Sequence, residues 1–302
     1  MLQFFASITG GGPLAARPAA PEELISKLVD DWTLQKLESL KGYLCAFTSA
    51  AKDQGFNAAY IDAFAGANYC GDNMGDASAL TGFADLANVS AKMLLKQSMR
   101  TALMSEPAFD GYVFIERDRR RGHVLEALRR EFAHCNIQIR RIEVNRELRR
   151  ISRLDWEVRR AVLLVDAYAA NLEWETVTAI SRTKAINLWL LFPVGIGSDQ
   201  PSARAVSFPP LWHDRLQVLT QTEERLLDPQ APVSACEALV DTLGHCLANR
   251  LKDTFVNVSA PHVMRNASGA PLYVHCFASA VPGLEGRSAV ALADQLLETM
   301  RR

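Results

Sequence analysis

The first long pattern in the chain is helical. Within Glu22–Ala51, apolar residues recur at steps of three and four positions, which places them on one face of a helix. The residues on this face are Leu34, Leu37, Leu40, Tyr43, Leu44 and Phe47. Gly55 follows, and we expect it to end the helix. The pattern therefore predicts a helix that packs one face against a core.

Five short runs rich in β-branched and aromatic residues follow at wide intervals. Their apolar residues are not confined to alternate positions, which is typical of strands buried on both faces. The predicted strands are Ala58–Phe64, Gly111–Glu116, Ile137–Val144, Ala161–Val165 and Ala185–Phe192, and the predicted helices between them are Ala77–Met104, Arg119–Phe132, Arg146–Val158 and Leu172–Arg182. Because parallel neighbours need crossover connections, this alternation predicts a doubly wound α/β fold with a mostly parallel sheet.

The pattern changes after residue 211. Helical periodicity covers Leu211–Leu227 and Ser234–Leu251, and two strand patterns follow at Asp253–Ser259 and Pro271–Ala278. The segment between these strands reads RNASGAP, whose turn-forming residues favour a hairpin. We therefore expect the sheet to finish with an antiparallel pair. The expected organisation is a flexible arm over residues 1–21 and one α/β domain over residues 22–302, with a helical insertion around residues 208–251.

Composition and charge restrict the class of protein only coarsely. The chain has 302 residues, 49% of them hydrophobic, and a formal charge of -1, so no overall charge attracts it to nucleic acid or to an anionic membrane. Its six cysteines are scattered without a C-x-x-C pair, which argues against structural zinc. The apolar start lacks a basic region and is too short for a membrane span, so we expect a cytoplasmic protein with reduced thiols.

Acidic residues end three of the predicted strands. Asp62 lies at the end of the first, followed by Gly66, where the backbone can approach a ligand closely. Glu116 ends the second, a position where doubly wound folds hold ribose hydroxyls, and Asp166 ends the fourth, with Tyr168 two residues on. The carboxyl ends of parallel strands meet at one edge of the sheet, so we expect these groups to converge on one crevice.

Each of these residues also has a purely structural interpretation. Asp62 fits a tight turn with a solvated carboxylate, and Glu116 fits a solvated strand end that pairs with a neighbouring arginine. Asp166 fits a helix N-cap, and Tyr168 fits a partly buried packing aromatic.

Six stretches together resemble the three-Cys-motif partner protein family. They are TLQKLESLKGYL (33–44), YIDAFAG (60–66), FIERD (114–118), LLVDAYAANLEWETVTAI (163–180), NLWLLFP (187–193) and PLYVHCFAS (271–279). The likeness keeps order and spacing over roughly residues 33–280. It implies a Rossmann-like class I methyltransferase fold, with a seven-stranded sheet whose last strand is antiparallel, and a site for S-adenosylmethionine. It also implies a partner protein that carries the three-cysteine motif.

The resemblance assigns roles to single residues. Asp62, Phe64 and Gly66 would face the methionine part of the cofactor, Glu116 would hold the ribose, and Asn145 would lie near the adenine. Asp166 and Tyr168 would meet the methyl acceptor, with Asp166 accepting hydrogen bonds from an amine and Tyr168 stacking on an extruded base. The resemblance thus implies methylation of an exocyclic amine of a nucleobase, or of another amine.

Three positions depart from the family pattern. Asn68 stands where a last glycine is expected, and Ala167 and Ala169 replace an expected proline and glycine. Asparagine tolerates positive φ better than most residues, whereas the two alanines leave the backbone beside Asp166 less fixed. The alternative interpretation is a catalytically degenerate accessory protein that works through a three-Cys-motif partner.

The segment between Arg117 and Arg160 is strongly basic. It holds fourteen arginines against seven acidic residues. A surface that faces nucleic acid is one interpretation, and solvated helix faces or a contact with a partner protein is the other. The six histidines accompany no serine or cysteine nucleophile motif, so hydrolase chemistry has no support.

Overall fold

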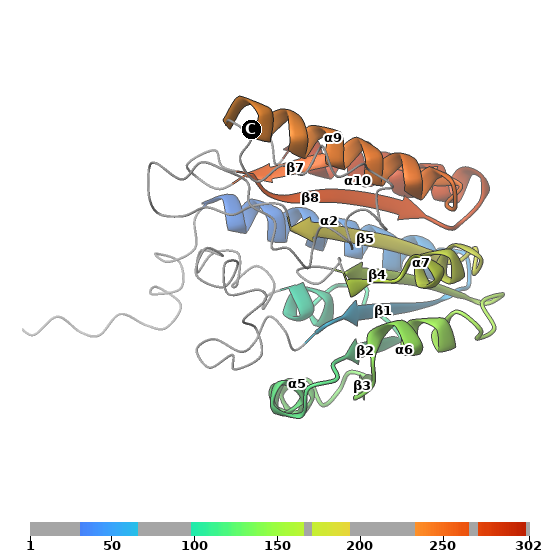
Figure 1. Cartoon of the computed structure of the whole chain (residues 1–302). Coiled ribbons are helices and arrows are strands. Elements are labelled where there is room, and N and C mark those ends of the chain that lie inside the picture. Colours follow the sequence, from blue (N-terminus) through green and yellow to red (C-terminus); the bar gives the residue numbers. More distant parts are fainter. Residues whose placement is uncertain (1–30, 66–97, 166–170, 194–232, 266–270, 300–302) are drawn as a thin grey trace, which may run out of the picture.

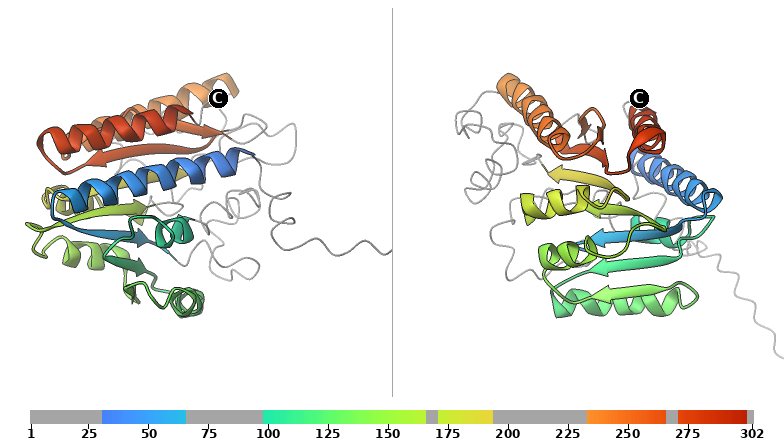
Figure 2. Two further views of the ribbon diagram at one scale, coloured as in Figure 1. Left: turned by 180° about the vertical axis from the view of Figure 1, so that it is seen from behind. Right: turned by 90° about the vertical axis from the view of Figure 1, so that its right-hand side faces the viewer.

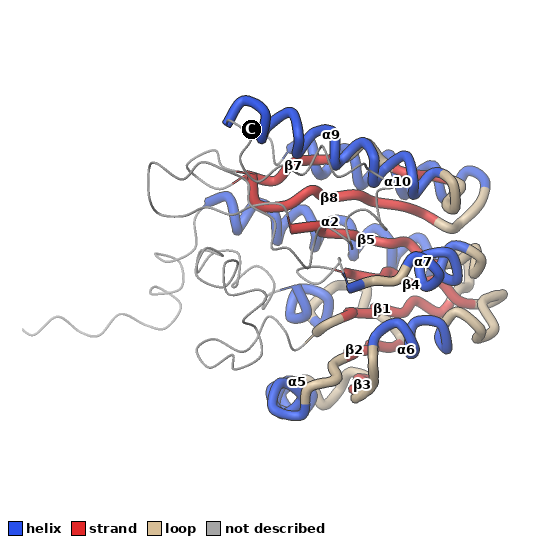
Figure 3. Tube along the Cα trace, viewed as in Figure 1, coloured by secondary structure: helices blue, strands red, loops and turns tan. Residues whose placement is uncertain are grey.

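The computed structural model describes residues 31–65, 98–165, 171–193, 233–265 and 271–299, and these form an α/β sandwich around one sheet (Figures 1 and 3). The strands are β1 (Asn57–Ala63), β2 (Gly111–Ile115), β3 (Ile137–Arg140), β4 (Arg159–Val165), β5 (Ile186–Pro193), β6 (Asn257–Val258), β7 (His262–Arg265) and β8 (Pro271–Ser279). The helices are α2 (Asp31–Asp53), α5 (Arg119–Glu131), α6 (Val144–Ile151), α7 (Trp174–Ser181), α9 (Val233–Lys252) and α10 (Gly283–Thr299). Residues 98–103 are also helical.

The sheet runs in the order β3-β2-β1-β4-β5-β8-β6, and β7 also pairs with β8. Strands β1 to β5 are parallel, whereas β8 is antiparallel to β5, β6 and β7. The predicted doubly wound α/β fold, with a mostly parallel sheet and an antiparallel last strand, is therefore confirmed. Within the described residues the sheet has eight strands, not the seven predicted, because β6 and β7 share the position beside β8.

Strand β4 shows why the sheet forms a middle layer. Its residues alternate between two buried clusters: Ala161, Leu163 and Val165 belong to one, and Val162 and Leu164 to the other. The first cluster includes residues of α6, α7 and α9, and the second includes residues of α2, α5, α10 and the helical segment 98–103. Figure 2 shows α6, α7 and α9 on one side of the sheet and α2 and α10 on the other.

Several predicted boundaries are wrong by a few residues. The predicted strand Ile137–Val144 ends at Arg140, because Glu143 caps a helix that begins at Val144. That helix ends at Ile151 and does not continue to residue 158. The predicted strand Asp253–Ser259 is reduced to Asn257–Val258, because the turn that ends α9 extends to Phe255, whose N–H donates to the Leu251 carbonyl at 2.8 Å. Strand β7 was not predicted from the sequence.

Other predictions hold or lie outside the described residues. Gly55 follows α2 with a φ of 77°, the left-handed conformation expected of a residue just beyond a helix end. The predicted arm, the helix at 211–227 and the turn at 266–270 lie outside the described residues, so the domain boundaries stay predictions. No described helix is long and apolar enough to cross a membrane. The described residues also hold no group of three potential metal ligands.

Candidate functional site

The carboxyl ends of β1, β4 and β5 point to the same edge of the sheet (Figure 1). The strand order reverses between β1 and β4, since β2 and β3 extend the sheet on one side and β4 and β5 on the other. The connections place α5 on one face and α6 and α7 on the opposite face. Open α/β sheets bind ligands outside the carboxyl ends of the strands at such a reversal. This edge is therefore the candidate site.

Asp62 lies one residue before the end of β1 and is only 1% exposed. The Tyr60 hydroxyl donates a hydrogen bond to Asp62 Oδ2 at 3.3 Å, so part of the carboxylate's hydrogen-bonding capacity is used inside the protein. The interpretation of Asp62 as a solvated turn residue is wrong, because its carboxylate is buried. The hydrogen bond from Tyr60 offsets part of the hydration that the carboxylate loses on burial.

Phe64 follows β1 and has a φ of 65°. This left-handed conformation costs an aromatic residue about 1–2 kcal/mol relative to ordinary backbone regions. The next residue continues the pairing, since the Ala65 N–H donates to the Ile115 carbonyl at 3.0 Å. The chain thus makes its tight turn at Phe64. Backbone freedom was predicted instead at Gly66, which lies outside the described residues.

Glu116 follows β2 directly and is 3% exposed. Its Oε1 accepts a hydrogen bond from the Asp118 N–H at 2.7 Å, which fixes the carboxylate at the turn from β2 into α5. Its own N–H donates to the Arg140 carbonyl at 3.0 Å, so the backbone still pairs with the end of β3. A buried carboxylate does not fit the alternative of a solvated strand end.

The register brings Asp62 and Glu116 to adjacent positions. Asp62 is paired with Phe114, and Ala63 with Ile115, the last residue of β2. Paired residues of parallel strands point to the same face, and residues two apart along a strand share a face. Glu116 follows Phe114 by two residues, so the two carboxylates lie diagonally on neighbouring strand ends. Their common edge was predicted from the sequence, and the register places them on a common face.

Asn145 lies in the first turn of α6 and is 4% exposed. Its Nδ2 donates to Glu143 Oε1 at 2.9 Å and to the Asn171 carbonyl at 3.0 Å, and its Oδ1 accepts from the Glu173 N–H at 2.8 Å. The side chain therefore ties α6 to the segment that precedes α7. Both of its amide hydrogens already have protein acceptors, and a contact with adenine stays a prediction.

Glu143 stabilises the same corner of the site and was missed from the sequence. Its carboxylate accepts the N–H groups of Asn145 and Arg146, each at 2.8 Å, as an N-cap does. Burial raises the pKa of Glu143, but these hydrogen bonds outweigh it and hold the pKa below its usual value. Glu143 is thus ionised at neutral pH and holds the start of α6 in place.

Asp166 and Tyr168, which were predicted to meet the methyl acceptor, lie outside the described residues. The same holds for Gly66, predicted at the cofactor, and for the three departures from the family pattern at Asn68, Ala167 and Ala169. Their flanks lie at the candidate edge: Val165 ends β4 in register with Ala63, and Asn171 accepts the hydrogen bond from Asn145. The roles of Asp166 and Tyr168 stay predictions.

Comparisons with known proteins give similarity at the level of the fold. No family model and no curated protein matches the chain. Similar solved structures include spermidine synthase in complex with the transition-state analogue AdoDATO (10% identity, TM-score 0.42), a putative O-methyltransferase from Klebsiella pneumoniae (9%, 0.39) and a protein of Legionella pneumophila (12%, 0.43). These matches cover 86%, 85% and 89% of this chain, and 63%, 95% and 91% of the other chains. The chain thus spans less than two thirds of the spermidine synthase it matches, and membership of the three-Cys-motif partner family stays a prediction.

Proposed function

We propose that this chain is an S-adenosylmethionine-dependent methyltransferase whose cofactor lies outside the carboxyl ends of β1 and β2. One observation carries the proposal: Asp62 and Glu116 are buried carboxylates at diagonal positions on two adjacent parallel strand ends. They lie beside the reversal of strand order between β1 and β4, where open α/β sheets bind nucleotide-like ligands.

The chemistry of these residues suits the cofactor. Its ribose hydroxyls and its ammonium group are hydrogen-bond donors, and an ionised carboxylate accepts up to about four hydrogen bonds. The Asp118 N–H fixes the orientation of Glu116 before a ligand binds, which lowers the entropic cost of holding the ribose. Phe64 and Gly66 would line the methionine end, and Asn145 the adenine end.

The methyl acceptor in this proposal is an amine, and an exocyclic amine of a nucleobase is the first candidate. The cofactor supplies the methyl group. Asp166 would accept hydrogen bonds from the amine and keep its lone pair aimed at the crevice, and Tyr168 would stack on the acceptor if it is a base. The support for this assignment is their place in the sequence directly after β4, next to the reversal of strand order.

Calorimetry with S-adenosylmethionine and with its demethylated product tests cofactor binding. We expect Glu116→Gln and Asp62→Asn each to weaken binding by roughly 1–3 kcal/mol, because both keep the side-chain shape but lose charge-assisted hydrogen bonds. Glu285→Gln is a matched control, since Glu285 pairs with Arg160, the second residue of β4, at the opposite edge of the sheet. No affinity of the wild type at millimolar cofactor would refute the proposal.

The accessory role is the second candidate, and the replacements at Ala167 and Ala169 favour it. An accessory protein keeps the fold but does not need a fixed backbone beside Asp166. A wild type that binds cofactor yet transfers no methyl group to nucleic acid, to small amines or to a co-purified three-Cys-motif partner would support this role over catalysis.

A further inference from the structure

Twelve of the fourteen arginines between residues 117 and 160 have side chains that the structure describes, and they fall into two classes. Six pair with a carboxylate, namely Arg129, Arg140, Arg141, Arg149, Arg150 and Arg160. Six others are exposed and, among the described residues, have no carboxylate partner: Arg117, Arg119, Arg130, Arg146, Arg153 and Arg159. Ion pairs within and between the elements of the fold account for the first class but not for the second.

The unpaired arginines gather at the two edges of the sheet. Arg117 and Arg119 follow β2, and Arg146 lies in the first turn of α6, shortly after β3. Strands β2 and β3 are parallel neighbours, so these three residues lie around the same carboxyl edge as Glu116. We call them the basic rim. Arg130, Arg153 and Arg159 lie at the opposite, amino edge, and two of them donate to backbone carbonyls, Arg130 to Glu126 and Arg159 to Asp155.

Helix stability does not account for the basic rim. The first turn of α5 contains no acidic residue and begins Arg119-Arg120-Arg121, although positive charge is unfavourable at the N-terminus of a helix. Over residues 117–122 the sequence has four arginines and one aspartate. A local arrangement that opposes the helix dipole is expected where the charge serves a function.

We propose that the basic rim of Arg117, Arg119 and Arg146 binds the phosphate backbone of a nucleic acid. Every basic residue between 117 and 160 is arginine and none is lysine. The planar guanidinium matches phosphate oxygens with two parallel hydrogen bonds, which an ammonium group cannot do. Neither acid close to Arg146 in sequence is free to neutralise it, because Glu147 pairs with Arg140 and Arg150 and Glu143 is committed to the N-cap of α6.

This surface borders the candidate cofactor site, because Arg117 is adjacent to Glu116 in the chain. A nucleic-acid strand whose phosphates are bound there lies beside the crevice. The acceptor amines of the proposed function are then those of nucleic-acid bases. That narrowing rests on the proposed function. The binding of nucleic acid does not, and it is measured without cofactor.

Fluorescence anisotropy of a labelled single-stranded oligonucleotide of roughly 20 nucleotides tests the proposal on the full chain. Wild type should bind at low salt, and its affinity should fall steeply as salt rises. The variant R117Q/R119Q/R146Q should bind at least about ten-fold more weakly, and its slope of log affinity against log salt should be flatter by about 2, since each lost phosphate contact contributes about 0.7. The control R130Q/R153Q/R159Q removes the same charge from the amino edge and should stay close to wild type. Melting curves of both variants check that they fold, and we expect no change because the replaced arginines are exposed.

Three outcomes would overturn the proposal. The wild type could fail to bind the oligonucleotide at low salt, or the control variant could lose as much affinity as the rim variant. The wild type could also bind polyglutamate as tightly as the oligonucleotide, which would assign the basic rim to an acidic protein. Calorimetry with S-adenosylmethionine separates this inference from the proposed function. Oligonucleotide binding without cofactor binding would refute the methyltransferase proposal and support the rim, whereas cofactor binding without oligonucleotide binding would do the reverse.

Discussion

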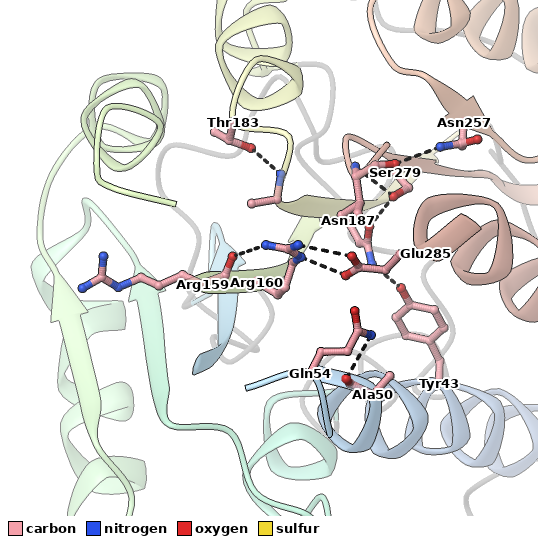
Figure 4. Close-up of polar contacts among 12 residues, drawn as sticks. Tyr43, Ala50, Gln54, Arg159, Arg160, Thr183, Asn187, Asn257, Ser279 and Glu285 are labelled. Carbon is pink, nitrogen blue, oxygen red and sulfur yellow. Dashed lines mark hydrogen bonds and ion pairs between the residues drawn. The ribbon is translucent and has the colours of Figure 1, made fainter. Parts of the chain in front are cut away.

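The Tyr43 hydroxyl accepts a hydrogen bond from Asn187 Nδ2 at 2.9 Å in the core between α2 and β5 (Figure 4). Ser279 Oγ of β8 donates to Asn187 Oδ1 at 2.6 Å and accepts the Val281 N–H at 3.2 Å. All three side chains are at most 3% exposed. One chain of hydrogen bonds therefore links α2 to two antiparallel neighbours of the sheet.

Tyr43→Phe should lower the free energy of unfolding by about 1–3 kcal/mol, because Asn187 would keep a buried N–H without its acceptor. Urea unfolding measures the change. The control is Gln54→Ala, directly after the end of the same helix. Its exposed amide donates to the Ala50 carbonyl (Figure 4), and its loss should matter by less than about 0.5 kcal/mol. Equal effects of the two substitutions would contradict the importance of the buried network.

Glu147 forms a second buried polar centre, on α6. Its side chain is fully buried, and it accepts from Arg150 Nε at 2.9 Å and from Arg140 Nε at 2.7 Å. The hydrogen bond from Arg150 is the main cause that lowers the pKa of Glu147, against the opposing effect of burial, and Arg140 adds to it. A lowered pKa means that the ion pair stabilises the fold above the usual glutamate pKa of 4.5 and that this contribution is lost as pH falls through the folded-state pKa.

Glu147→Gln should therefore lower the free energy of unfolding at pH 7 by about 1–3 kcal/mol. This loss is smaller than for a fully buried ion pair, because Arg140 and Arg150 are partly exposed to solvent. The gap to wild type should narrow below about pH 4.5. Glu131→Gln, which removes the exposed partner of Arg100, should leave unfolding nearly unchanged. A gap that stays constant across pH would show that the charge of Glu147 does not contribute.

Local patterns predicted the layers of the fold well. Strand β4 was recognisable because AVLLV is apolar at successive positions, which fits burial on both faces. Strand β7 was missed because it is short and its pairing with β8 is interrupted between Met264 and Arg265. The early end of β3 depends on Glu143, whose capping hydrogen bonds leave only a weak signal in the sequence.

The candidate site was predicted in part. Acidic residues at strand ends located Asp62 and Glu116 at one edge, but their common face depends on the register of β1 and β2. The left-handed turn at Phe64 could not be predicted, since aromatic residues rarely adopt it. The pairing of Tyr43 with Asn187 joins residues 144 positions apart, and no local pattern encodes such a contact.

Two glycines in helices should respond oppositely to alanine. A Cβ on Gly286, in the first turn of α10, would lie 1.9 Å from the Val281 carbonyl oxygen and 2.4 Å from Asn257 Nδ2, so Gly286→Ala should cost about 1–3 kcal/mol or more through overpacking. A Cβ on Gly42 in α2 would meet only Leu296 Cδ2 at 3.8 Å, so Gly42→Ala should stabilise the helix by roughly 0.5–1 kcal/mol. Thermal unfolding of both variants checks the signs, and tolerance of Gly286→Ala would refute the close packing of α10 on β6.

His275 on β8 should make the fold sensitive to acid. It is 1% exposed, and its ring centroid lies 4.7 Å from that of Trp189. Neither nitrogen of the His275 ring has a hydrogen-bond partner among the described residues. Burial, with a smaller contribution from neighbouring His262, lowers its pKa from 6.5 to about 3. His262 Nε2 in turn lies 3.3 Å from Asp294 Oδ1 of α10.

The sign of the pH effect follows from proton uptake. Between pH 6.5 and about 3 the unfolded chain binds a proton at His275 that the folded chain does not, so the free energy of unfolding should fall by about 1.4 kcal/mol for each unit that pH drops. His275→Leu should flatten this slope between about pH 6.5 and 5, a window that lies above the glutamate range. His123→Gln, at an exposed position on α5, should keep it. Urea unfolding at a series of pH values measures the slope, and a wild-type slope no steeper than that of His275→Leu would mean that this histidine becomes protonated in the folded protein as readily as in the unfolded chain.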